Sequence, residues 1–370
     1  MSTSDGTGAG DGMSGIDTNS ETAELTATLR AVFADHPVEV TDGLPAKLWS
    51  TLADLGVTRL TLAESAGGSG GSLADAAALL LAAGEAAAPV PLAETDLLGA
   101  WLLHAAGLPV PDEGPLAAVT AGALEVTSAG GSAVRVHGSL GRIGWARYAT
   151  RIAVLATGAD GGDIVLAIDP AADGVTLSEG ANLAGEPRDE VVLDLEVSEV
   201  AAAPANAQEL LERRAALARA LLMAGAGATA LRQSVRYAGE RVQFGRSIGK
   251  FQAVQQQLAM AAAEVAAARA AADAATRIAA ADDFGGDDAG LAIAVAKARA
   301  GEMAGEVARI THQVHGAIGF TLEHSLRLAT TRLWSWRDED GDETRWNAEV
   351  ARRALAAGPE GLWALITRAS

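Results

Sequence analysis

Two helical patterns that flank a short β-rich segment constrain the fold of this 370-residue chain more than any other feature. Apolar residues recur every three or four positions from residue 23 onward, as at Leu25, Leu29 and Val32. The middle of the chain changes to short β-branched runs, where Leu193, Leu195 and Val197 alternate with acidic residues. The sequence therefore predicts an α+β fold with an N-terminal helical domain, a small antiparallel β domain and a C-terminal helical bundle, over residues 23–108, 109–205 and 206–370. Residues 1–22 are mostly Gly, Ser, Thr and Asp, which predicts a disordered tail.

Composition restricts the partners that such a chain can have. There are 28 basic and 47 acidic residues, and a net charge of −19 argues against nucleic acid and anionic membrane as general partners. The absence of cysteine excludes disulfides, thiolate catalysis and cysteine metal sites. We find no secretory signal, which makes the cytoplasm the expected location, and no apolar run of the roughly 18–20 residues that a membrane span requires.

The segment Tyr237–Gln252 places Arg241, Arg246 and Lys250 in an otherwise acidic chain. The glycines interrupt a helical pattern, and a new helix is predicted to begin directly after them. Basic side chains beside a helix N-terminus form a reasonable site for an anion, and the phenylalanines of the segment have the shape to lie against a flat ring. An exposed basic loop with its phenylalanines in the core explains the pattern equally well.

Two further segments carry groups with chemical potential. In residues 311–334 three histidines occur, but their spacing matches no common metal motif, so the HGAIGF run is interpreted as a break between helices. Residues 338–343 hold five carboxylates. One of them is a candidate base, because burial raises the pKa of a carboxyl group, whereas a solvated acidic loop is the simpler interpretation.

Together these segments resemble the acyl-CoA dehydrogenase family. The run YAGERVQFGRSIGKFQAVQQ resembles the family's Arg-x-x-Phe-Gly and Phe-Gln block, and HQVHGAIGFTLEH resembles its Gln-x-x-Gly-Gly-x-Gly-Phe/Tyr-Thr-x-Glu block. With LGVTRLTLAESAGGSGGSLADAA upstream, the resemblance spans nearly all of residues 23–370. It implies a C-terminal four-helix bundle and an FAD-dependent oxidation of an acyl-CoA thioester to its 2-enoyl product. In that reaction a carboxylate removes the α-proton and the β-hydrogen leaves as hydride to the flavin.

The resemblance also implies a set of cofactor-binding residues. In the family the first block reaches across a subunit interface toward the FAD of a neighbouring subunit. Arg241 would meet the pyrophosphate, where a planar guanidinium suits a bidentate contact. The remaining residues implied near the adenosine half are Gln243, Phe244, Gln252, Gln313 and Gly316. At least a dimer is expected, with acyl-CoA as substrate and an electron-transfer flavoprotein as electron acceptor.

Departures from the family pattern leave the active site open to three interpretations. The β domain offers LAAVTAGALEVTSAGG and GSLGRIGWARYAT where the family has flavin-binding loops, and the family's base position falls on Asp340, with Glu339 as a weaker candidate. These departures resemble the smaller, β-type subunit of heteromeric α2β2 acyl-CoA dehydrogenases that act on steroid side chains. The first alternative is a catalytic homotetramer that uses Asp340 as its base. The second is a helical scaffold that has lost its flavin.

Overall fold

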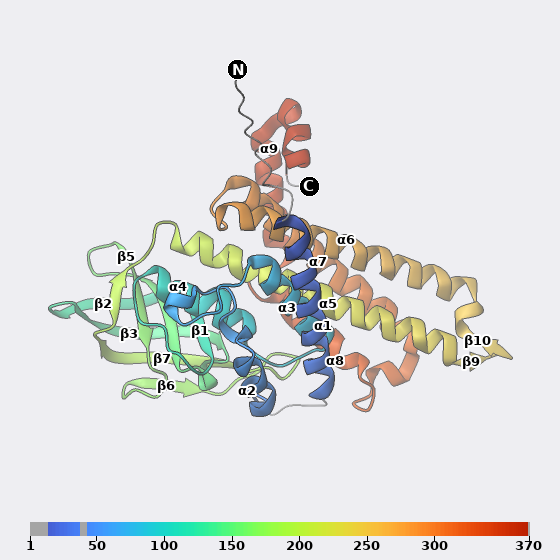
Figure 1. Ribbon diagram of the computed structural model, residues 1–370, viewed down its shortest axis with the longest axis horizontal. Helices are drawn as coiled ribbons and strands as arrows, with labels where there is room; N and C mark the ends of the chain where they lie inside the picture. Colours follow the sequence, from blue (N-terminus) through green and yellow to red (C-terminus); the bar gives the residue numbers. More distant parts are fainter. Residues whose placement is uncertain (1–13, 38–42, 369–370) are drawn as a thin grey trace, which may run out of the picture.

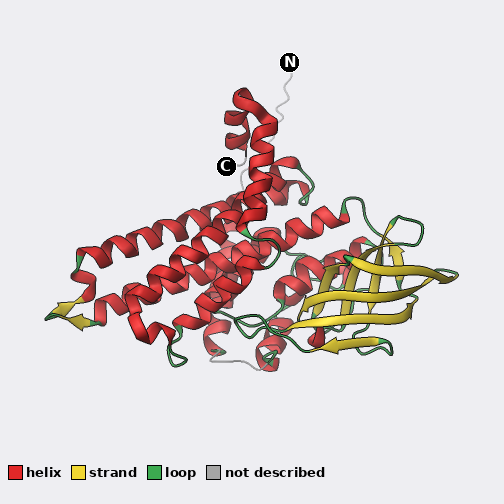
Figure 2. Cartoon of the chain, turned by 180° about the vertical axis from the view of Figure 1, so that it is seen from behind, coloured by secondary structure: helices red, strands yellow, loops and turns green. Residues whose placement is uncertain are grey.

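The computed structural model describes residues 14–37 and 43–368 and divides them between long helices and a compact β region (Figures 1 and 2). Ser14 begins the first helix, so residues 14–22, expected in the tail, are helical, and residues 1–13 of that expectation lie outside the described part. The N-terminal elements are α1 (Ser14–Asp35), α2 (Ala46–Asp54), η1 (Val57–Arg59), η2 (Glu64–Ala66), α3 (Leu73–Glu85), the π-helix η3 (Glu94–Ala100) and α4 (Trp101–Ala105).

Local sequence signals explain where the N-terminal helices begin and end. Ser72 and Asp75 form a capping box at the start of α3, in which each side chain accepts a hydrogen bond from the other residue's backbone amide. Gly56 follows α2 with φ of 73°, a left-handed conformation that glycine adopts without strain. Leu55 follows the last residue of α2 and is 45% exposed, whereas Leu48 and Leu52 of the helix are buried.

The middle segment forms two four-stranded sheets that share one apolar core. Its elements are β1 (Leu116–Thr120), β2 (Ala123–Gly130), β3 (Ala133–Gly144), η4 (Ala146–Tyr148), β4 (Arg151–Thr157), β5 (Asp163–Ile168), β6 (Val175–Ser178), β7 (Arg188–Val197) and β8 (Val200–Ala202). The strand orders are β1-β4-β5-β8 and β2-β3-β7-β6. The expected antiparallel pairing is found throughout except between β1 and β4, which run parallel with Leu116 opposite Arg151.

The C-terminal half is a helical bundle built around α5 (Figure 1). It comprises α5 (Ala207–Glu240), the hairpin β9 (Val242–Gln243) and β10 (Arg246–Ser247), η5 (Ile248–Lys250), α6 (Gln252–Asp282), α7 (Asp287–His315), η6 (Gly316–Phe320), α8 (Leu326–Asp338) and α9 (Glu343–Arg368). None of the helices in the described ranges is long and apolar enough to cross a membrane.

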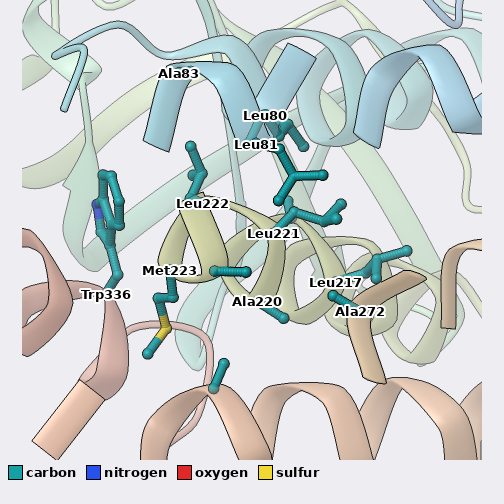
Figure 3. Close-up of a cluster of buried hydrophobic side chains, with 14 of the residues drawn as sticks. Leu80, Leu81, Ala83, Leu217, Ala220, Leu221, Leu222, Met223, Ala272 and Trp336 are labelled. Atoms are coloured by element: carbon teal, nitrogen blue, oxygen red, sulfur yellow. The ribbon is translucent and has the colours of Figure 1, made fainter. Parts of the chain in front are cut away.

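A close crossing of α3 and α5 joins the N-terminal helices to the bundle. A Cβ atom added at Gly84 would lie 2.1 Å from the Leu222 carbonyl oxygen, and one at Gly225 would lie 2.2 Å from that of Leu81. Only glycine permits the two backbones to approach this closely. Around the crossing, leucine side chains of both helices and Trp336 of α8 belong to the main core (Figure 3).

Candidate functional site

The hairpin β9–β10 carries the basic segment to the end of the bundle farthest from the β domain (Figure 2). Phe244 and Gly245 form its turn with φ of 51° and 77°, and Phe244 is 91% exposed, so the interpretation that it belongs to the core is wrong. Arg241, Gln243 and Gln252 are exposed as well. Within the described part of the chain, no carboxylate forms an ion pair with Arg241.

The second predicted block lies at the same end of the bundle. Gln313 and Gly316 are exposed at the C-terminus of α7, where Gly316 turns the chain with φ of 62°. The ring of Tyr237 on α5 stacks on His315 of α7 at 4.5 Å, which brings the ends of the two helices together. His315 is buried, and this burial lowers the pKa of its imidazole.

The chemistry of these residues suits the groups of one half of FAD, a diphosphate and an adenosine. The exposed guanidinium of Arg241 has the charge that a diphosphate requires, and the neighbouring amides supply donors and acceptors for an adenosine. The same end of the bundle exposes apolar side chains, with Ile318, Phe320 and Leu322 at 44%, 68% and 81%. Exposed apolar side chains gathered beside such polar groups are typical of a surface that a partner chain covers.

A separate cavity of about 320 Å³ lies between the β domain and α5. Asp340 is part of its wall, in the loop between α8 and α9, with φ of 56° followed by Gly341 with φ of 90°. The cavity is lined by Glu94, Leu98, Ala118, Val119, Thr120, Arg142, Ile143, Gly144, Arg188, Leu211, Glu212, Ala215, Arg219, Glu339 and Asp340. The structure thus brings both candidate bases to one cavity and places the hairpin residues elsewhere.

Arg219 of α5 occupies the centre of this cavity's charge network. Its Nε donates to Asp340 Oδ2 at 2.8 Å and its Nη2 donates to Glu94 Oε1 at 2.7 Å. Nη2 also lies 3.3 Å from Glu339 Oε2. Burial disfavours the charged guanidinium, but the three carboxylates outweigh burial and raise the pKa of Arg219 well above its ordinary value.

Glu339 accepts more hydrogen bonds than Asp340 does. Arg188 donates to both of its carboxylate oxygens, at 2.9 and 2.5 Å, and Asn182 Nδ2 donates at 2.9 Å. Burial opposes ionisation of Glu339, yet Arg219, Arg188 and the hydrogen bonds lower the pKa of its carboxyl group. Glu339 and Asp340 are therefore both paired with arginines, and the solvated acidic loop expected from the sequence is wrong for these two residues.

A buried lysine holds the loop between α8 and α9 in place. Lys297 of α7 is fully buried, and its Nζ donates to the carbonyl oxygens of Arg337 at 2.9 Å and Gly341 at 2.6 Å. Burial lowers the pKa of Lys297 to about 8. Because the two carbonyls lie on either side of Glu339 and Asp340, Lys297 holds both carboxylates in the cavity wall.

The β-domain turn beside the cavity has its backbone donors satisfied within the chain. The amide of Trp145 donates to the Pro187 carbonyl at 3.1 Å, and the amide of Arg147 donates to Asp189 Oδ2 at 2.9 Å. The Trp145 side chain is 2% exposed. This turn therefore offers neither of these two amides as a donor to a flavin ring.

Sequence reasoning did not identify the arginines that neutralise the carboxylates. Arg213, Arg214 and Arg219 lie among the buried alanines and leucines of α5. Arginines within such an apolar run are the sequence signal that could have identified them. Charged side chains in such a run require buried partners. The carboxylate partners of Arg219 lie more than a hundred residues away in the sequence, and no local pattern identifies them.

Comparison with known proteins gives consistent results. Residues 205–355 match the family described as acyl-CoA dehydrogenase, C-terminal domain. Acyl-CoA dehydrogenase IpdE2 of Mycolicibacterium smegmatis is 30% identical over 290 residues, which cover 77% of this chain and 81% of the relative. The fold is similar to the ChsE4–ChsE5 complex of Mycobacterium tuberculosis, with a TM-score of 0.82, 23% identity and coverage of 91% and 98%. The Tcur3481–Tcur3483 steroid ACAD variant gives a TM-score of 0.82, 26% identity and coverage of 92% and 99%.

Proposed function

The chain belongs to the acyl-CoA dehydrogenase family, and we propose that it is the non-catalytic subunit of a heteromeric enzyme in which it completes the partner's FAD site. Members of this family are FAD-dependent oxidoreductases that act on CH–CH donors. In that reaction this chain would bind FAD and would not itself carry the catalytic base. The partner of the same family supplies the base and the flavin-ring pocket.

The observation that carries the proposal is the pairing of Arg219 with Glu94 and Asp340 inside the cavity. A catalytic base must present a free carboxylate to the proton that it removes. Here Asp340 Oδ2 already accepts a hydrogen bond from Arg219 Nε, so this oxygen is occupied within the chain. An acyl chain entering the cavity would also have to contact buried charges, which costs free energy unless their partners remain in place.

The hairpin supports the positive part of the proposal. FAD, when bound, supplies the hydride acceptor of the family's reaction. Arg241 would neutralise the diphosphate, Phe244 would lie against the adenosine half, and Gln252 and Gln313 would hydrogen-bond to it. All of these side chains are exposed, as is required of groups that reach into another subunit.

The relatives support the choice of partner and substrate class. One similar structure is a complex of two named chains, ChsE4 and ChsE5, and another is described as a steroid ACAD. We therefore propose an α2β2 assembly with a homologous acyl-CoA dehydrogenase subunit, an acyl-CoA with a bulky steroid-derived acyl group as substrate, and an electron-transfer flavoprotein as electron acceptor.

One observation favours a second candidate function, a catalytic homotetramer. Asp340 lines the same cavity as Ala215, and the spacing of the family's motif assigns the base position to Asp340. The test is Asp340→Asn in the purified assembly, because asparagine keeps an oxygen that accepts the Arg219 hydrogen bond.

Acyl-CoA-dependent bleaching of the flavin absorbance should change by less than about twofold in this variant, since the partner carries the base. Flavin content and the melting temperature serve as controls. A loss of about a hundredfold with normal flavin content, the size typical of a removed general base, would identify Asp340 as the catalyst. A purified assembly without flavin absorbance would instead favour the flavin-free scaffold.

A further inference from the structure

A second cavity of about 440 Å³ opens between the N-terminal helices and the end of α6. It shares no lining residue with the cavity around Arg219. Its volume lies within the range of small-molecule pockets in proteins. The walls are mostly apolar, and the lining residues are Thr61, Leu62, Ala63, Gly71, Ser72, Leu73, Asp96, Leu97, Trp101, His104, Arg214, Ala279, Ala280, Asp283 and Phe284.

Arg214 is the cation of this cavity. Its guanidinium carbon lies over two aromatic rings, 4.4 Å from the centroid of Trp101 and 4.3 Å from that of Phe284. The residue is 4% exposed, and within the described part of the chain its Nε has no hydrogen-bond partner. The rings fix the plane of the guanidinium by cation–π contact and leave only its edge for polar partners. A buried arginine with an unused donor is expected to bind an anion.

The present partner of Arg214 is a carboxylate that belongs to a strained turn. Asp283 Oδ1 accepts from Arg214 Nη2 at 2.5 Å, although the side chain of Asp283 is 82% exposed. Asp283 and Phe284 both have left-handed backbones, with φ of 49° and 70°. Such a conformation costs about 1–2 kcal/mol for each non-glycine residue. The chain therefore holds a solvent-exposed carboxylate on the guanidinium edge at a conformational cost.

We propose that this cavity binds a small carboxylic acid with an apolar body, whose carboxylate takes the place of Asp283 on Arg214. The apolar body would lie along the leucines and alanines of the wall, next to Trp101. The exposed Asp283 acts as an internal competitor that closes the site when no ligand is present. This inference does not rest on the proposed function, because none of its residues belongs to the hairpin or to the Arg219 cavity.

The proposal includes a dependence on pH through Asp96. This residue is 3% exposed, it accepts hydrogen bonds from the amide and hydroxyl of Thr61, and burial raises its pKa to about 6. Ionised Asp96 partly offsets the charge of Arg214. Besides Asp283, the other charged or titratable groups nearby are His104 at the cavity and Arg59, which interacts with Asp96. Protonation of Asp96 should therefore strengthen carboxylate binding, since carboxylic acids stay ionised above about pH 5.

The test is titration of the full chain, in the assembly in which it is purified, with octanoate followed by calorimetry at pH 7.5 and 5.5. We expect saturable binding that is tighter at pH 5.5. Asp283→Ala should tighten it about tenfold at both pH values, because the internal competitor is removed. Arg214→Gln should weaken it at least tenfold. Octanol, which lacks the charge, should bind at least tenfold more weakly than octanoate.

The control variant is Arg269→Gln, which removes an exposed arginine of α6 and should leave octanoate binding unchanged. Absence of saturable octanoate binding to the unmodified chain would overturn the proposal. Equal affinity of the unmodified chain and Asp283→Ala would overturn it too, and that comparison stays decisive if Arg214→Gln fails to fold. Equal binding of octanol and octanoate would reduce the cavity to a nonspecific apolar pocket and also contradict the proposal.

Discussion

Arg219 is 7% exposed and contacts three carboxylates from two separate segments of the chain. Its role is visible only in the folded structure, since Glu94 is 125 residues away and Asp340 is 121 residues away. The sequence predicted the position of Asp340 at the site from the spacing of the family's motif. It did not predict that this carboxylate is neutralised, because the charge state of a buried group depends on long-range partners.

Replacing Arg219 by methionine should destabilise the fold strongly. Methionine keeps only the apolar stem of the side chain and leaves the buried Glu94 and the partly exposed Asp340 without their cation. Breaking a buried ion pair in this way costs about 3–5 kcal/mol of unfolding free energy. Urea unfolding measures the change, and Arg269→Met is the matched control, because its exposed pair with Asp273 should contribute less than about 1 kcal/mol. A loss of unfolding free energy below about 1 kcal/mol in Arg219→Met would contradict the stabilising role of the Arg219 ion pairs.

Lys297 should make stability depend on alkaline pH. Its pKa of about 8 in the fold lies below the ordinary value of 10.5, so above pH 8 the unfolded chain binds more protons at this residue than the folded one. Stability linked to Lys297 therefore rises between pH 8 and about 10.5, by about 3 kcal/mol in total. Both hydrogen bonds survive, since a neutral amine keeps two hydrogens for two carbonyls.

The measurement is the unfolding free energy of the native chain minus that of Lys297→Met, taken from pH 7.5 to 10. The subtraction cancels the titration of other residues. The difference should increase steadily with pH above 8. A flat difference would show that Lys297 keeps its ordinary pKa and is not desolvated by the loop that it holds.

At the scale of elements, sequence patterns located most helices and strands, and their errors have identifiable causes. Alternation in β7 and the capping box of α3 are local signals, and both appear in the structure. The parallel pairing of β1 with β4 was not predicted, because strand direction is set by the connection between the two strands and not by composition. From the sequence, the hairpin segment could be either an anion-binding site or an exposed loop. A local sequence pattern does not show what covers the exposed Phe244.

The hairpin β9–β10 should be dispensable for folding and necessary for flavin retention. Phe244→Ala removes a ring that is 91% exposed, so the melting temperature should stay within about 2 °C of the native value. Flavin retained by the assembly should fall at least tenfold, as measured by absorbance after gel filtration. Leu183→Ala, at a residue that is 65% exposed in a loop of the β domain, should change neither quantity. Full flavin retention in Phe244→Ala would remove the hairpin from the cofactor site.

At the scale of the whole molecule, the proposed cofactor-binding surface and the cavity around Arg219 lie apart. The end of the bundle exposes a cation and an aromatic ring suited to FAD, while the β-domain turn and the charged side chains that line the Arg219 cavity are engaged in the chain's own hydrogen bonds and ion pairs. Two copies of such a chain would each contribute the same half of the site. A complete site requires a different partner, which is why the account predicts a heteromer.

The most direct test of this claim is the flavin content of the chain purified alone and after co-expression with a homologous acyl-CoA dehydrogenase subunit, with native mass spectrometry to count the subunits. The account predicts a colourless preparation alone and, after co-expression, an α2β2 assembly that holds one FAD per pair of different subunits. A stable yellow homotetramer with one FAD per chain, active on acyl-CoA without any partner, would contradict it.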